Sequence, residues 1–171
     1  MAIPRLEILK ETLEYLQKLG VPLTKIAIQK ALYFVKATGL PVGYSFEPYY
    51  YGPYSSELAE DLDDLCFWDQ LKKKDEKTYD IINLGKTNVP NWYKELLHDR
   101  LSQFIKALDK NFNFANLELV GTVAYCCRAL KNSGDELTEQ NLLQEVKAWK
   151  GTKYTEQQIL HFFRKIKDFI Q

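Results

Sequence analysis

The spacing of apolar residues at the start of the chain predicts two helices joined by a short turn. The first helix covers residues 4–19, and its apolar positions recur at steps of three and four: Leu6, Leu9, Leu13 and Leu16. Gly20 ends this helix, and Thr24 provides the N-cap of a second helix over residues 24–39. We therefore expect a helical hairpin at the start of the fold.

The pattern changes after the second helix. Residues 40–46 contain Pro, Gly and aromatic side chains and predict a short extended segment, and Gly52-Pro53 predicts a turn. Ser55 or Ser56 then caps a third helix over residues 55–65. Residues 68–71 and 79–84 are strand-like, and the charged stretch 72–77 between them predicts an exposed hairpin tip. Helices followed by such a hairpin resemble the order of a winged helix-turn-helix.

The second half of the chain predicts helices almost throughout. One helix covers residues 92–108, and a second, over residues 117–130, is apolar nearly all round, which is typical of a central buried helix. Thr138 and Thr155 begin two further helices. We predict a mainly α fold with one small antiparallel β-sheet, a single domain over residues 1–171. Its winged-helix-like part, residues 1–86, packs on a helical bundle, residues 90–171.

Composition and charge narrow the function classes. The 171 residues carry 23 basic and 23 acidic side chains, so no net charge draws the chain toward nucleic acid or anionic lipid. The sequence has neither a signal-peptide pattern nor an apolar run of membrane-spanning length. Three cysteines without CxxC spacing favour buried thiols in a reducing compartment: Cys66, Cys126 and Cys127. We expect a cytoplasmic protein without a membrane partner.

No motif for catalysis or cofactor binding stands out. His98 and His161 are the only histidines, and neither belongs to HxxxH or HExxH spacing. The eight glycines are scattered singly, so phosphate-binding glycine loops are absent. A cysteine–histidine pair that forms only in the folded state remains an open alternative. We interpret the chain as a non-enzyme without a cofactor, with an uncharacterised hydrolase as the lowest-ranked alternative.

The third predicted helix carries a run of acidic residues. Glu57, Glu60 and Asp61 share one helix face and could bind a divalent cation, but their place near the helix N-terminus favours a solvated face. No metal site is predicted. In a winged helix this helix would enter the DNA major groove, where its carboxylates meet the phosphates. Nucleic-acid binding would therefore need the basic tip at Lys72, Lys73 and Lys74.

A cluster of tyrosines precedes the acidic helix. Tyr is enriched in protein-interface hot spots, because it combines a large rigid ring with a polar tip. In an extended run Tyr49 and Tyr51 would lie on one face and Tyr50 on the other. Packing of these rings between the helix and the hairpin is the alternative. The candidate protein-binding residues are Tyr49, Tyr51, Tyr54, Glu57, Asp61 and Asp64.

Two segments together resemble a known family. The stretch IQKALYF, with Lys30 and Tyr33, is followed by the stretch YGPYSSEL, which begins at Tyr51, Gly52 and Pro53. These residues resemble the motif of the Panacea domain, also called the SocA-like or phage GepA-type domain. The resemblance covers residues 23–84. Here Tyr54-Ser55 follows the motif, where many members have an apolar residue and another Pro.

The resemblance implies a function in toxin–antitoxin systems. Panacea domains are antitoxins that neutralise unrelated toxins by direct binding, and at least one member delivers its toxin to a protease. No catalytic residues are assigned to the family. Our leading hypothesis is therefore a protein-interaction module whose partner is a cognate toxin or a protease system. A winged-helix nucleic-acid-binding regulator is the alternative.

Overall fold

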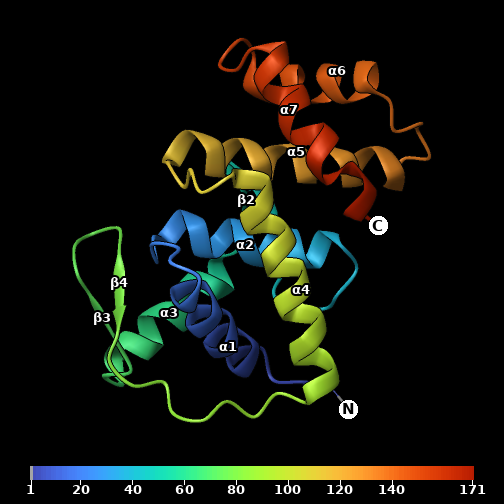
Figure 1. The fold of residues 1–171 in the computed structure, drawn as a ribbon. Coiled ribbons are helices and arrows are strands. Elements are labelled where there is room, and N and C mark those ends of the chain that lie inside the picture. Colours follow the sequence, from blue (N-terminus) through green and yellow to red (C-terminus); the bar gives the residue numbers. More distant parts are fainter. Residues whose placement is uncertain (1) are drawn as a thin grey trace.

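The computed structural model describes residues 2–171 and confirms a mainly α fold with small antiparallel β elements (Figure 1). The elements, in chain order, are α1 Arg5–Lys18, α2 Lys25–Ala37, β1 Glu47–Tyr49, β2 Gly52–Tyr54, α3 Ser56–Phe67, β3 Leu71–Lys73, β4 Tyr79–Ile81, α4 Asn91–Leu108, α5 Phe114–Asn132, α6 Glu139–Lys150, α7 Glu156–Ile166 and the 3₁₀ turn Lys167–Phe169. The predicted small sheet is present as two separate antiparallel hairpins.

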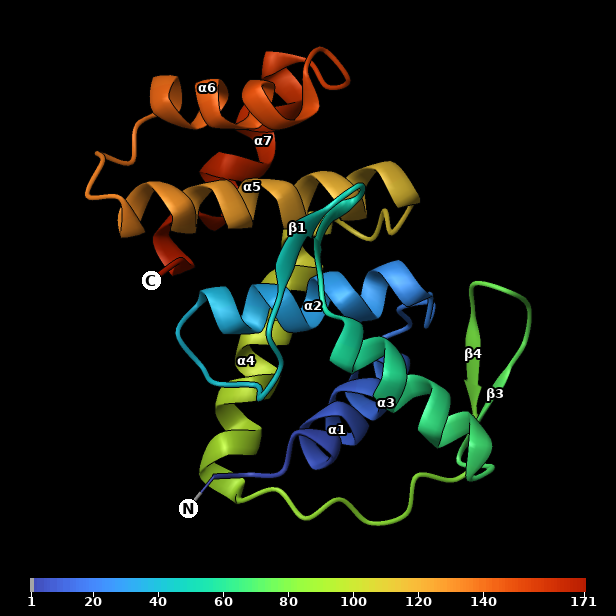
Figure 2. The same cartoon turned by 180° about the vertical axis from the view of Figure 1, so that it is seen from behind.

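Helix α5 lies at the centre of the molecule. It packs against α2 on one side and against α6 and α7 on the other, while α1 and α3 lie beyond α2 (Figures 1 and 2). Helix α4 connects these layers, because it contacts α1, α2, α5 and α7. Most of α5 is buried, including small residues such as Gly121 and Ala124. This burial agrees with the apolar surface that the sequence shows nearly all round this helix.

Side-chain caps define where the helices begin. The hydroxyl oxygens of Thr24, Ser55, Thr138 and Thr155 each accept a hydrogen bond from the backbone amide three residues later. These caps confirm the predicted helix starts and select Ser55 over Ser56 as the cap of α3. Asn113 caps α5 in the same way, so this helix begins before the predicted residue 117. Each cap satisfies an amide that the helix itself leaves free.

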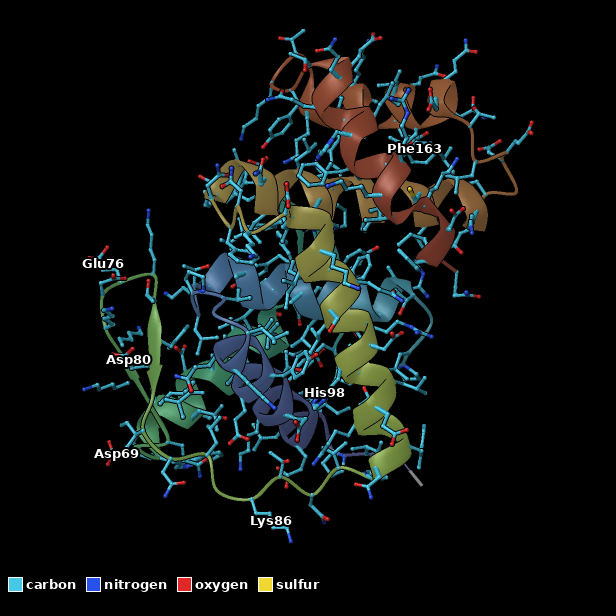
Figure 3. All side chains as sticks on the ribbon, viewed as in Figure 1. Asp69, Glu76, Asp80, Lys86, His98 and Phe163 are labelled. Atoms are coloured by element: carbon cyan, nitrogen blue, oxygen red, sulfur yellow. The ribbon has the colours of Figure 1, made fainter. Side chains whose placement is uncertain are left out.

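The β3–β4 hairpin follows α3 as predicted, but its strands are shorter and β3 begins later. Helix α3 continues to Phe67, and the chain then turns through Asp69 at a φ of 56°, so β3 begins only at Leu71. The hairpin also joins the start of α2, because Thr24 and Thr78 form an isolated antiparallel bridge. Figure 3 shows Glu76 at the exposed tip.

The segment before α3 corrects two predictions. Residues 40–46 form an irregular connection, and the extended structure begins only at Glu47. Gly52-Pro53 is not the turn. The chain reverses at Tyr50 and Tyr51, and Tyr49 pairs with Gly52 across a two-residue loop. Tyr is a weak turn former, so sequence rules favoured Gly-Pro. We call residues 47–54 the tyrosine hairpin; Figure 2 shows it rising between α2 and α5.

The helices fall short of what a membrane span requires. Among residues 2–171, no helix combines the length and the apolar character needed to cross a bilayer.

Candidate functional site

Three side chains from the two helices α2 and α6 hold the backbone of the tyrosine hairpin. Lys30 Nζ of α2 donates to the Pro53 carbonyl at 2.6 Å, and Lys150 Nζ of α6 donates to the Tyr50 carbonyl at 2.7 Å. Just after the hairpin, the Gln29 side-chain amide makes two 2.8 Å hydrogen bonds with the backbone of Ser55. The carboxamide therefore acts like a neighbouring β-strand. Together these contacts fix both the loop and the base of the hairpin.

Proline determines which edges of the hairpin can pair. Pro48 and Pro53 face each other in the strand register, and neither has an amide hydrogen. In an antiparallel ladder, this pair occupies the position whose backbone groups point outward. The outward carbonyl of Pro53 is already bound by Lys30. The hairpin is therefore a poor template for strand addition, and recognition there depends on side chains.

Two glycines allow the close approach between the hairpin and the helices. Gly52 has a φ of +98°, and a Cβ atom there would lie 3.2 Å from Thr122 Oγ1 of α5. A Cβ atom on Gly121 would lie 2.8 Å from Lys30 Cδ, a distance that ordinary packing does not allow. The Lys30 side chain thus passes along α5 in space that only glycine leaves open.

The charges beneath the hairpin form a buried cluster. Lys30 is 2% exposed, and burial together with the nearby charge of Lys150 lowers its pKa to about 7. The Glu118 side chain of α5 is fully buried; its two oxygens lie 2.8 Å from Lys150 Nζ and 2.7 Å from Lys153 Nζ. Burial alone would raise the pKa of Glu118, but hydrogen bonds from both lysines lower it below its usual value.

The tyrosines themselves remain at the surface. Tyr49, Tyr50, Tyr51 and Tyr54 are 56%, 78%, 54% and 38% exposed. They do not alternate as one extended strand would, because the chain reverses between them. Tyr49 stacks on Tyr54 at a ring-centroid distance of 5.5 Å, and Tyr51 meets Phe114 edge-on at 4.9 Å. The alternative in which these rings pack between helix and hairpin is therefore not what the structure shows.

A pocket opens beside the tyrosine hairpin. Its volume is about 520 Å³, within the usual range of ligand pockets. The wall combines α2, α3, the hairpin and the segment before α5, with mostly apolar side chains that include Tyr51, Tyr54, Leu62, Phe112 and Phe114. Lys25, Lys77 and Asp63 contribute the exposed charges at its edge. We call this the hairpin pocket.

The acidic candidates separate into two groups. Asp61 is 8% exposed and binds Arg5 Nε at 3.0 Å, while Glu57 accepts from Arg5 at 2.9 Å. Tyr44 also donates to Asp61, at 2.7 Å. Both carboxylates therefore link α3 to Arg5 at the start of α1; Asp61 is buried, whereas the Glu57 side chain remains partly exposed. Among the predicted interface acids, Asp64 is exposed.

The histidines and cysteines that the sequence analysis considered for catalysis lie outside the hairpin pocket. Figure 3 shows His98 on α4. Its Nε2 lies 2.9 Å from the Glu11 carboxylate of α1, and its ring stacks on Tyr15. Neither His98 nor Glu11 lines the hairpin pocket. Cys126 and Cys127 are buried thiols whose pKa burial raises to about 12, whereas Cys66 is half-buried. His161 is exposed. Within residues 2–171, no group of three or more His, Cys, Asp or Glu residues is placed to hold a metal ion.

The structure gives a physical role to each residue of the sequence motif. The contacts by which side chains of α2 and α6 hold the tyrosine hairpin form what we call the hairpin clamp. Lys30, Gly52 and Pro53 meet in this clamp, and Tyr51 forms part of the pocket wall. Tyr33 is buried on α2 beside Phe46, and burial raises its pKa. Sequence reasoning quoted Gln29 without assigning it a role, and it missed the remote half of the clamp: Glu118, Gly121, Thr122 and Lys150. Glu118 within an otherwise apolar helix was the one visible signal, because a buried carboxylate requires partners.

Comparisons with known protein families and with curated proteins yield no relative of this chain. No family model matches the chain, and a search of the curated proteins finds no match.

Proposed function

We propose that this chain is a protein-interaction module that binds a partner protein through the tyrosine hairpin. One observation carries the proposal. Four tyrosine rings stay exposed on a backbone that buried side chains of α2 and α6 hold in place. Large amphipathic rings on a fixed backbone lose little conformational entropy on binding, which is the property of interface hot spots.

The partner that fits best is a toxin that the chain neutralises by direct binding. Support comes from the Panacea-like motif, whose residues build the clamp that presents the tyrosines. Helix α3, which follows the hairpin in the chain, exposes Glu60, Asp63 and Asp64, and Asp63 lines the hairpin pocket with Tyr51 and Tyr54. These acids favour a protein partner over nucleic acid. The chain would act by covering the toxin, with no chemistry of its own.

Coexpression with the product of the neighbouring gene tests this proposal. We expect that product to arrest growth alone and to form a stable complex with the chain that restores growth. A neighbour that is harmless alone, combined with the absence of a complex, would refute the antitoxin function.

Substitutions in the hairpin test the binding surface. Tyr50→Ala should weaken the complex by roughly 2 kcal/mol, the hot-spot range, while the thermal midpoint of the free chain stays unchanged. Trp92→Ala is the matched control, because Trp92 is 61% exposed on α4, away from the hairpin. Equal effects of the two substitutions on affinity would show that the hairpin is not part of the interface. A lower thermal midpoint for Tyr50→Ala would assign this ring to the fold instead.

A further inference from the structure

The hairpin pocket combines an apolar interior with an edge that carries an excess of positive charge. Aromatic rings of Tyr51, Phe112 and Phe114 line it, and its size suits one bulky side chain with its neighbours. Two exposed lysines lie at the edge, and they are held close together because the Lys25 amide donates to the Lys77 carbonyl at 2.8 Å.

Neither of these lysines is neutralised within the described part of the chain. Between residues 2 and 171, no carboxylate lies within ion-pair distance of the Lys25 or Lys77 ammonium. Asp63 is the one acidic residue in the pocket wall. Lys30 also lines the inner wall, but its amine is buried and bound to the Pro53 carbonyl, so Lys25 and Lys77 provide the exposed positive groups. The pocket therefore presents more positive than negative groups around an apolar interior.

The start of α2 adds an independent electrostatic argument. The positive end of a helix dipole favours acidic side chains in the first turn. The first turn of α2 contains no acidic residue, and its first residue is Lys25. Backbone and side-chain acceptors cap the terminus, but neither it nor the two lysines has a carboxylate partner within the described residues, and they lie at the same edge of the pocket.

We propose that the hairpin pocket binds a segment of the partner protein in which a bulky apolar side chain is flanked by carboxylates. The apolar side chain enters between Tyr51, Phe112 and Phe114, and a carboxylate lies at the start of α2 beside Lys25 and Lys77. This inference rests on the proposed protein-binding function and specifies the chemistry of the partner. It assigns recognition of an acidic aromatic segment to a site beside the exposed tyrosines.

Short capped peptides test the pocket without a known partner. The probe is acetyl-Glu-Trp-Glu-amide, and the controls are acetyl-Gln-Trp-Gln-amide and acetyl-Glu-Ala-Glu-amide. Binding is followed by amide chemical shifts of the ¹⁵N-labelled chain. We expect saturable shifts around Lys25, Lys77 and Phe114 with the probe. The Gln peptide should bind about fivefold more weakly, as two exposed ion pairs imply, and the Ala peptide should give no saturable shift.

Matched variants separate charge from shape. Lys25→Glu combined with Lys77→Glu should abolish the preference for the Glu peptide, whereas Lys72→Glu combined with Lys74→Glu, exposed on the same β-hairpin, should preserve it. Ala59→Leu, which extends a side chain of the pocket wall, should weaken the binding of both Trp-containing peptides. Equal binding of the Glu and Gln peptides, or shifts confined to another surface, would overturn the inference.

The outcomes also distinguish this inference from the proposed function. If the partner complex depends on Tyr50 but the peptides bind without charge preference, only the acidic-segment proposal is refuted. Peptide binding that follows the expected order, without any partner complex, removes the antitoxin function and retains the pocket.

Discussion

The buried amine of Lys30 should make stability depend on pH in a window where most proteins change little. The pKa of Lys30 is about 7 in the folded chain, against an ordinary value of 10.5. Between these values the unfolded chain binds one more proton than the folded chain, so the free energy of unfolding rises with pH. Integrated from pH 7 to about 9.5, the gain amounts to about 3 kcal/mol.

Lys30→Met isolates this effect. Methionine fills similar space without the amine but leaves the Pro53 carbonyl without its donor, which costs roughly 1–3 kcal/mol. At about pH 9.5 we therefore expect the variant to be less stable than the wild type. At pH 7 the cost of holding the lysine near its titration point offsets this loss, so the two proteins should have similar stability. The difference between them should grow by about 3 kcal/mol over the window.

Urea denaturation followed by circular dichroism at half-unit pH steps measures these free energies. Buried tyrosines such as Tyr33 and Tyr93 titrate identically in both proteins and cancel in the comparison. Lys72→Met, at an exposed position of β3, is the control and should show no trend. A constant difference between wild type and Lys30→Met would refute the reasoning. A difference that shrinks as pH rises would show that Lys30 is stabilised as a cation.

Three other predictions concern Gly121 and Glu118 of α5 and the basic tip of the β3–β4 hairpin. Gly121→Ala should lower the free energy of unfolding by about 1–3 kcal/mol, measured by urea titration, because its methyl group meets Lys30; unchanged stability would mean that the lysine moves freely. Glu118→Gln should cost about 3–5 kcal/mol by leaving Lys150 buried without its carboxylate, and it should flatten the acid branch of the stability profile. The sign follows from the lowered pKa of Glu118, whose stabilisation is complete above its unfolded value and is lost as pH falls through the folded one. Duplex DNA should bind weakly at moderate salt in fluorescence anisotropy, and Lys72→Glu should not alter that binding; a steep salt dependence that this substitution removes would favour the regulator alternative.

The sequence predicted the helical elements well because their signals are local. Apolar spacing located the helices, and threonine caps such as Thr24 and Thr155 fixed where they begin. The long all-apolar stretch correctly indicated that α5 is buried. Lys30 and Pro53, which the sequence analysis singled out in two separate segments, are hydrogen-bonded to each other.

The tyrosine hairpin could not be derived in the same way. Its turn at Tyr50 and Tyr51 has no turn-forming residue, and it is stabilised by Lys150, a hundred residues later in the chain. The division among the acidic candidates could not be derived for a similar reason. Asp61 has the same local pattern as Asp64, and only the distant Arg5 distinguishes a buried ion pair from an exposed carboxylate.

The hairpin clamp limits how freely the tyrosine hairpin can be exchanged between proteins. The segment that carries the Panacea-like motif supplies Lys30, but the space for that side chain is provided by Gly121 and the second lysine comes from α6. A graft of the motif onto an unrelated helical bundle would thus lack half of the contacts that hold the hairpin. Sequence changes in the C-terminal helices can therefore alter the conformation of the tyrosine hairpin without changing any of its tyrosines.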